Sequence, residues 1–263
     1  MDSGLEMSPV LMGTVASLLA GLATAAGALA IFAVRQISDR TQDVMLGFAA
    51  GVMLAASFFS LILPGLGIAE AQGASQLGAV TLISGGVLIG AACLWLIHRY
   101  VPHEHFISGR EGPHVQRFAR VWLFVIAITI HNIPEGLAVG VGFGGGDIAN
   151  GIPLAIGIGI QNMPEGLAVA LALLTLGYPK ISAFAVAGLT GLVEPVGGLV
   201  GSGAVSLAEF LLPWGLAFAA GAMIFVISDE IIPETHRKGM EGQGTVGLMI
   251  GVVVMMYLDV ALG

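Results

Sequence analysis

The sequence predicts an all-α, polytopic membrane protein with eight transmembrane helices, and three observations carry this prediction. Of the 263 residues, 56% are apolar and only 10% are charged, whereas a soluble domain carries roughly 25% charged residues. Apolar stretches of about 20 residues, the length that crosses a bilayer, recur along the whole chain. Glycine is abundant, with 40 residues, which is typical of membrane helices that pack closely.

The predicted spans are separated by charged residues, prolines or glycine clusters. They cover residues 9–34, 44–69, 77–97, 121–143, 152–176, 181–203, 211–232 and 246–262. The longest connection, 98–120, is too short for a second domain, so we expect a single transmembrane domain over 1–263.

The basic residues support this number of spans, because all nine fall in alternate connections. They are Arg35, Arg40, Arg99, Arg110, Arg117, Arg120, Lys180, Arg237 and Lys238. Basic connections face the cytoplasm, so both termini are expected on the extracytoplasmic side. A wrong number of spans would scatter these charges over both faces. The absence of a basic run also disfavours nucleic-acid binding.

Two consecutive spans carry the same polar motif. The run 131–136 reads His-Asn-Ile-Pro-Glu-Gly, and the run 161–166 reads Gln-Asn-Met-Pro-Glu-Gly. Polar residues inside a span are expensive and usually functional. Successive spans are antiparallel, so the two motifs can face each other near the bilayer midplane if the helices are neighbours.

The spacing within each motif is that of a helix face. His131 and Glu135 are four residues apart, and so are Gln161 and Glu165, so each pair lies on one face. Asn132 is three residues from Glu135 and lies beside it.

The motif prolines and glycines should shape the backbone around these side chains. Pro134 and Pro164 lack an amide donor, so each is expected to kink its helix and to free a carbonyl group. Such backbone is tolerated at membrane depth only where it lines a cavity or is buried in protein. Gly136 and Gly166 permit close approach of a neighbouring helix.

Charge indicates what the motifs could hold. Glu135, Glu165 and Glu194 would gather negative charge in a low-dielectric space, and no Lys or Arg lies in any span. The three carboxyl groups must therefore hold protons or bind a cation. A set of imidazole, carboxylate and amide ligands suits zinc, iron(II), manganese or cadmium.

Structural alternatives exist for each of these groups. One proline–glutamate pair could be a kink with a protonated, hydrogen-bonded carboxyl, and Glu194 before Pro195 could serve only the backbone. Two matched motifs together with a third glutamate favour a metal site. Asp229, Glu230 and Asp259 fit a polar network at helix ends better than a primary site. His103 and His105 are spaced for chelation, although solvated histidines are common in loops.

These residues make the sequence resemble the ZIP (Zrt/Irt-like protein) family of divalent metal transporters, and specifically its bacterial GufA-type branch. The resemblance covers nearly the whole chain. The matching stretches are 41–65, 102–105, 131–139, 161–169, 194–195, 232–237 and 258–263.

The resemblance implies a ZIP-type bundle of eight helices with a two-metal centre. The implied ligands are His131, Asn132, Glu135, Gln161, Asn162, Glu165 and Glu194, with Met53 nearby. The implied exit or regulatory residues are His103, His105, Asp229, Glu230 and His236. It further implies that spans one, four, five and six move against the other four, that the protein is a homodimer, and that it is a multi-pass protein of the cell inner (plasma) membrane.

One departure concerns the second metal. Asn162 stands where the GufA-type pattern has aspartate, and an amide oxygen binds metal more weakly than a carboxylate does. The second position is therefore expected to be the weaker one.

The function that this reading predicts is transport of zinc into the cytoplasm by alternating access, with cadmium, iron and manganese as further candidate substrates and no organic cofactor. The rival readings are a membrane-embedded dimetal enzyme and a metal-selective channel. Against the enzyme, the sequence has no His-Glu-x-x-His helix and no candidate nucleophile beside a base.

Overall fold

The computed structural model describes residues 8–33, 38–100, 117–146, 148–175, 177–235 and 241–262, and these residues form helices and no strand. Three predicted site residues, His103, His105 and His236, lie outside the described residues. Within the described part, seven helical segments are long and apolar enough to cross a membrane. The all-α, polytopic architecture is thereby confirmed.

The seven segments match seven of the predicted spans. They are Pro9–Phe32, Arg40–Ala71, Gln76–Ile97, Gly151–Leu174, Lys180–Leu207, Leu212–Asp229 and Gly242–Leu262. The predicted fourth span corresponds to α5, Arg117–Gly144, whose 28 residues make a helix about 42 Å long at about 1.5 Å per residue.

A serine caps the start of each of the first two spans. The hydroxyl of Ser8 accepts a hydrogen bond from Leu11 N at 3.2 Å, and that of Ser38 accepts one from Thr41 N at 3.1 Å, so each serine caps a helix.

The elements in order are α1 (Pro9–Ala28), η1 (Leu29–Phe32), α2 (Asp39–Ala56), η2 (Ser57–Ile62), α3 (Leu63–Ala71), α4 (Gln76–Tyr100), α5 (Arg117–Gly144), α6 (Ile148–Thr175), α7 (Lys180–Gly191), α8 (Glu194–Leu207), η3 (Glu209–Leu211), α9 (Leu212–Val226), η4 (Ile227–Ile231), α10 (Ile232–Thr235) and α11 (Glu241–Leu262).

Four of the described spans are not uniform α-helices. The first span ends in the 3-10 segment η1. The span formed by α2 and α3 contains the π-helical segment η2, and the span formed by α9 and α10 contains the π-helical segment η4. The predicted sixth span is broken into α7 and α8. Such interruptions often accompany functional sites, and the break before α8 lies at the candidate site.

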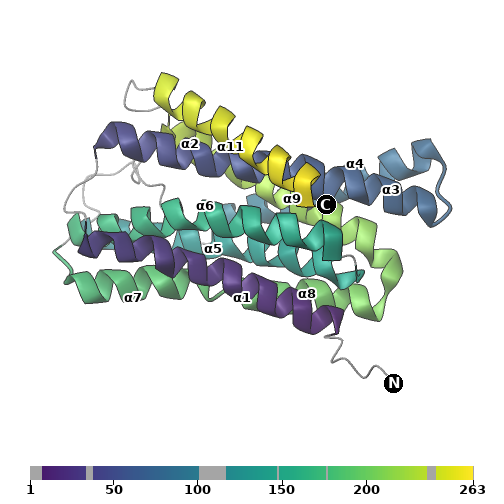
Figure 1. Ribbon diagram of the computed structural model, residues 1–263, viewed down its shortest axis with the longest axis horizontal. Coiled ribbons are helices and arrows are strands. Elements are labelled where there is room, and N and C mark those ends of the chain that lie inside the picture. Colours follow the sequence, from purple (N-terminus) through teal and green to yellow (C-terminus); the bar gives the residue numbers. More distant parts are fainter. Residues whose placement is uncertain are drawn as a thin grey trace.

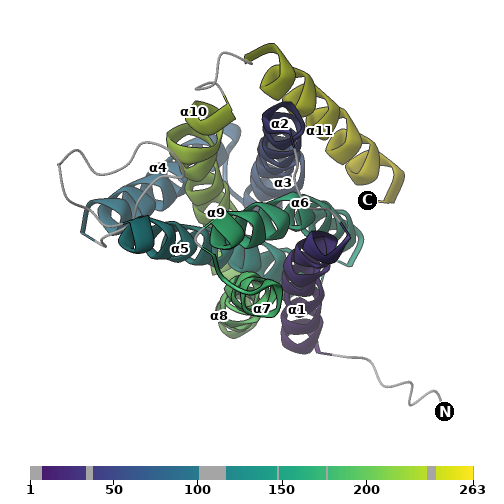
Figure 2. The same ribbon diagram turned by 90° about the vertical axis from the view of Figure 1, so that its left-hand side faces the viewer.

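The spans pack in two groups. α1 packs on α6 and on α8, and α5 packs on α8, whereas α2 pairs with α11 and α4 pairs with α9. Figure 1 shows the helices side by side, and in the end-on view of Figure 2 α1, α7 and α8 lie on one side of α6, with α2 and α11 on the other. α6 lies between the groups, since it contacts both α1 and α2. α5 likewise contacts α8 of the first group and α9 of the second, so both motif helices are central.

The distribution of polarity is inverted relative to a soluble protein. Large apolar side chains face outward, as Leu207 (90% exposed) and Leu77 (78% exposed) illustrate. Charged and amide side chains of the motifs are buried inside. An apolar exterior around a polar interior is the arrangement expected of a membrane-spanning bundle.

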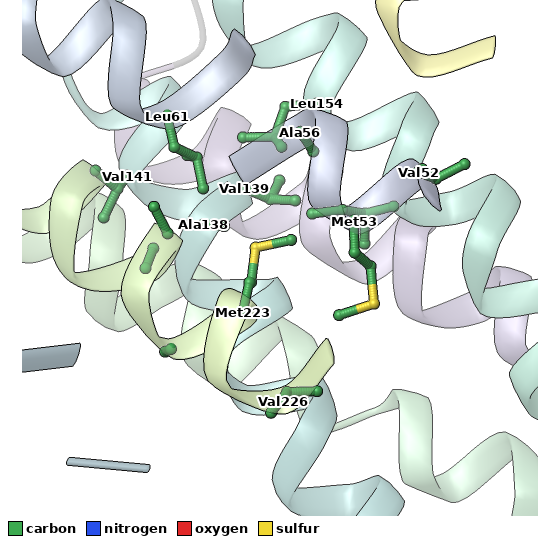
Figure 3. Packing of buried hydrophobic residues seen from close by; sticks show 14 of the residues in the cluster. Val52, Met53, Ala56, Leu61, Ala138, Val139, Val141, Leu154, Met223 and Val226 are labelled. Carbon is green, nitrogen blue, oxygen red and sulfur yellow. The ribbon is translucent and has the colours of Figure 1, made fainter. Parts of the chain in front are cut away.

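An apolar cluster fixes the motif helices against the second group. Figure 3 shows Met53 of α2 and Met223 of α9 in this cluster with Ala138 and Val139 of α5. Ala138 and Val139 lie within one helical turn after Gly136, the last residue of the first motif. Because these residues are closely packed, they fix the position of α5 along its axis at a point less than one turn from the motif.

Candidate metal centre

α5 presents its motif with the polar residues inward. Asn132 is 1% exposed and Glu135 is completely buried, whereas Ile133 between them is 44% exposed. The helix runs without interruption through Pro134. Since a helix turns by about 100° per residue, burying Asn132 and Glu135 turns Ile133 outward. The apolar residue of this motif thus faces away from the centre.

α6 repeats this arrangement. Gln161 and Asn162 are completely buried and Glu165 is 4% exposed, while Met163 is 45% exposed. The helix also continues through Pro164. The amide and carboxyl groups of the second motif are therefore gathered on the inward face, as the spacing predicted.

The broken sixth span supplies the third glutamate. α7 ends at Gly191, and α8 begins at Glu194 with Pro195 in its first turn. Proline has no N–H to continue the preceding helix, and it is well tolerated at the start of a new one. The carboxyl of Glu194 is completely buried, and its place at a helix N-terminus favours its negative charge.

Glycines bring the elements together at this depth. A side chain at Gly136 of α5 would collide with the carbonyl of Glu194, and one at Gly166 of α6 would collide with the carbonyl of Thr24 on α1. The backbones touch because these residues have no Cβ atom. The glycine at the end of each motif therefore sets how closely two helices approach, α5 and α8 at Gly136 and α6 and α1 at Gly166.

A chain of amide hydrogen bonds crosses the site. Gln161 Nε2 donates to Asn162 Oδ1 at 2.6 Å, and Asn162 Nδ2 donates to Glu194 Oε1 at 2.7 Å. The same Nδ2 group also donates to the carbonyl of Ala20 on α1 at 2.9 Å. Asn162 is thus connected to α1, α6 and α8 at once.

Other polar atoms of the site have no such partner. Both amide atoms of Asn132, Gln161 Oε1 and Glu194 Oε2 are buried without a hydrogen bond. The oxygens of Glu135 also lack a bond of standard geometry, although the Gln161 side chain is close enough to interact with them. Buried polar atoms without partners are rare and costly, so this group calls for a ligand.

The ligand that the charges favour is a cation. The Glu135 carboxyl interacts unfavourably with those of Glu165 and Glu194, and residues 121–179 and 181–236 contain no Lys or Arg. In a low-dielectric interior, a divalent ion offsets such repulsion. Amide and carboxylate oxygens are both ligands for divalent metals.

Carboxyl groups alone do not complete a metal site in the described part of the chain. There, no three side chains of His, Cys, Asp or Glu come together in a metal-binding group. A site at this position therefore draws on its amide groups as well. His131 lies in α5 one turn before Glu135, and its side chain is not among those described.

The remaining predicted residues have the following places in the fold. Met53 is buried in the apolar cluster next to the motif helices. Asp229 is exposed in η4, and for Glu230, also in η4, only the backbone is described. Asp259, which we assigned to a polar network, accepts a hydrogen bond from Ser60 Oγ at 2.6 Å. Asp259 therefore joins α11 to the π-helical segment η2.

One wall of the site could not be predicted from the sequence. Ala20, Gly21 and Thr24 of α1 lie against Asn162, Glu194 and Gly166. The alternation of Gly and Ala along α1 could have marked it as a closely packed helix. It could not have shown which neighbour α1 contacts.

The chain is similar in sequence to known proteins along most of its length. The family model described as "ZIP Zinc transporter" matches residues 98–259. "Zinc transporter GufA" of Myxococcus xanthus is 47% identical over 251 residues, which are 95% of this chain and 99% of the relative. "Zinc transporter ZIPB" of Bordetella bronchiseptica is 52% identical over 241 residues, 92% of this chain and 78% of the relative.

The similarity extends beyond bacteria. "Zinc transporter ZIP11" of Homo sapiens is 37% identical over a gapped alignment of 321 positions, which covers 91% of this chain and 94% of the relative. In each of these relatives the match covers well over two thirds of both chains.

Proposed function

Because the chain belongs to the ZIP zinc transporter family, we propose that it carries zinc across a membrane through the buried centre between α5, α6 and α8. The observation that supports this most directly is the group of buried carboxyl and amide atoms without hydrogen-bond partners. The family consists of transporters, so the chain is a transporter and not a dimetal enzyme.

The proposed zinc ligands divide into two positions that share two glutamates. His131, Glu135, Gln161 and Glu165 hold the first ion, with Met53 next to it. The second position has the ligands Asn132, Glu135, Asn162, Glu165 and Glu194. An imidazole nitrogen and two carboxylates suit zinc, and cadmium, iron(II) and manganese are further substrates in this proposal.

The second position is weaker, and Asn162 is the reason. Its Nδ2 group donates to Glu194 Oε1, so it occupies a lone pair that a metal would need. An ion entering there must displace this hydrogen bond as well as the one from Gln161. We therefore expect one zinc ion per chain at modest zinc concentration.

The proposed topology has eight spans, with α5 as the fourth. α2, α5 and α7 begin at the same end of the bundle, at the left in Figure 1, and Arg40, Arg117 and Lys180 lie in their first turns. With basic residues in the cytoplasm, both termini are extracytoplasmic. The protein then lies in the inner (plasma) membrane as a single transmembrane transporter domain, and zinc moves inward.

Alternating access would require relative motion of the two helix groups. The group of α1, α5, α6 and α7–α8 carries all proposed ligands except Met53, so it can move as a unit with the ion. His103, His105, Asp229, Glu230 and His236 are the proposed receiving groups on the cytoplasmic side. The protein is proposed to work as a homodimer.

Zinc uptake into proteoliposomes tests the proposal. The His131→Ala and Glu165→Ala variants should lose most of the saturable uptake, because each removes a ligand of the first ion. Met163→Leu is the matched control, since Met163 lies within the motif but is 45% exposed. Unchanged uptake in both ligand variants would overturn the site, and uptake that does not saturate would favour a channel.

A further inference from the structure

We infer that Thr24 on α1 is a specificity-determining residue of the transport site, where its hydroxyl is an oxygen donor to the ion at the Glu194 end. The inference rests on the proposed function. It adds a helix and a ligand type that neither motif contains.

The hydroxyl of Thr24 differs from those of other helical threonines in this chain. Thr14, Thr81 and Thr129 each donate to the carbonyl four residues earlier, at 2.7 Å. Thr24 is 1% exposed, and its Oγ1 atom has no hydrogen-bond partner.

The carbonyl that Thr24 would ordinarily use is engaged by the site. Four residues before Thr24 is Ala20, and the Ala20 carbonyl accepts a hydrogen bond from Asn162 Nδ2 at 2.9 Å. The side chain of Asn162 thus takes the place that the threonine hydroxyl commonly fills in a helix. The same amide group also bonds Glu194, so Thr24 is linked to the site through its own helix.

The hydroxyl points toward the break between α7 and α8. A Cβ atom at Gly191, the last residue of α7, would lie 2.8 Å from Thr24 Oγ1. One turn earlier on α1, a Cβ atom at Gly21 would lie 3.3 Å from Glu194 Oε1. Gly21 and Thr24 are three residues apart and share a helix face. The face that carries the Thr24 hydroxyl therefore also faces the Glu194 carboxyl.

Two buried oxygens at this end of the site have no partner, Thr24 Oγ1 and Glu194 Oε2. A buried polar atom is normally paired, so two together indicate a ligand that binds both. A divalent ion, directly or through one bound water, is such a ligand. Asn162 offers this ion an amide oxygen, which is a weaker ligand than a carboxylate. The Thr24 hydroxyl would add a further oxygen ligand at the same position.

The Thr24→Val variant tests this inference, because valine has the shape of threonine without the hydroxyl. Zinc and manganese affinities of the purified full chain are measured by equilibrium dialysis, together with the melting temperature in EDTA. We expect zinc affinity to fall roughly tenfold, the range for loss of one supporting group at a metal site. Manganese affinity should fall further, because manganese depends more on oxygen ligands.

The metal-free protein should respond differently. Because Thr24→Val removes an unpaired buried hydroxyl, the melting temperature of this variant in EDTA should be unchanged or higher. Thr24→Ser keeps the hydroxyl and should retain the wild-type ratio of zinc affinity to manganese affinity. The control is Thr190→Val, since Thr190 is also buried but donates to the Ala187 carbonyl at 2.8 Å. It should leave the ratio of the two affinities unchanged.

The opposite results separate this inference from the proposed function. Wild-type affinities in Thr24→Val, or an equal loss for both metals with a lower EDTA melting temperature, would overturn the role of Thr24. If Glu135→Gln still lowers zinc affinity in the same assay, the site itself stands. If Glu135→Gln has no effect either, the proposed function fails.

Discussion

Asn162 Nδ2 lies 2.7 Å from Glu194 Oε1, and this hydrogen bond joins the second motif to the first residue of α8. The amide supplies two protons, one to the carboxylate and one to the Ala20 carbonyl. Asn162 therefore directs two N–H dipoles at oxygen atoms of the site, and the one that reaches Glu194 offsets part of the negative charge of that carboxylate.

Asn162→Asp should convert the weak second position into a strong one. Aspartate cannot donate to Glu194 or to Ala20, so the metal-free protein loses about 1–3 kcal/mol of stability for a buried acceptor left unpaired. With zinc, the added carboxylate is a better ligand than the amide. We expect a lower melting temperature in EDTA and a rise from one to two zinc ions per chain, measured by elemental analysis.

Asn162→Ala is the control for that substitution, because it removes the donor without adding a charge. It should lower the melting temperature in EDTA and leave the zinc content at one ion. Equal zinc content in wild type and Asn162→Asp would contradict the blocking role of the amide.

Gly136→Ala should disturb the contact between α5 and α8. The new methyl group would collide with the Glu194 carbonyl, which belongs to the backbone and cannot turn away. Overpacking of this kind costs about 1–3 kcal/mol, and displacing α8 also moves the Glu194 carboxyl. We expect a lower melting temperature and reduced zinc uptake.

Gly203→Ala in α8 is the matched control, since nothing lies within 4 Å of a Cβ atom at that position. It should behave as wild type in both assays. Full zinc uptake by Gly136→Ala would show that the approach of α5 to α8 is not needed for the site.

Lys180 should stabilise the C-terminal end of the first span. Its Nζ donates to the Ile31 carbonyl at 2.6 Å and lies 6.0 Å from the centre of the Phe32 ring. A charged donor at a helix C-terminus is favourable. Lys180→Met keeps the apolar stem and should cost about 1–2 kcal/mol, seen as a lower melting temperature in detergent. An unchanged melting temperature would mean that water replaces Lys180 as the hydrogen-bond donor to the Ile31 carbonyl without loss of stability.

The eight-span topology predicts the side of each connection. In a Cys93→Ala background, which removes the only native cysteine, an impermeant maleimide should label Gln72→Cys in intact cells. Pro179→Cys should be labelled only after the cells are permeabilised. The reverse pattern would invert the orientation, and labelling of both variants in intact cells would refute the eight-span arrangement.

Much of the fold was predictable because its signals are local. Runs of apolar residues defined the spans, and the four-residue spacing in 131–135 and 161–165 placed polar groups on one helix face. The outward position of Ile133 and Met163 follows from the same helical geometry.

The rest depends on contacts between distant segments. The run 181–203 reads as one apolar span, yet the chain breaks before Glu194, where Gly191 and Pro195 allow a turn. Nothing in the apolar run of α1 indicates that Ala20 and Thr24 border the site, because that follows from how α1 packs on α6. The π-helical segment Ser57–Ile62 has no sequence signal that we could recognise.

The central claim is that zinc binds between α5, α6 and α8, and anomalous diffraction at the zinc absorption edge tests it most directly. The account predicts one strong peak, with carboxylate oxygens of Glu135 and Glu165 about 2.0–2.2 Å away, and a second, weaker peak beside Glu194 only at high zinc concentration. A strong peak elsewhere in the bundle, with none near Glu135 and Glu165, would contradict it.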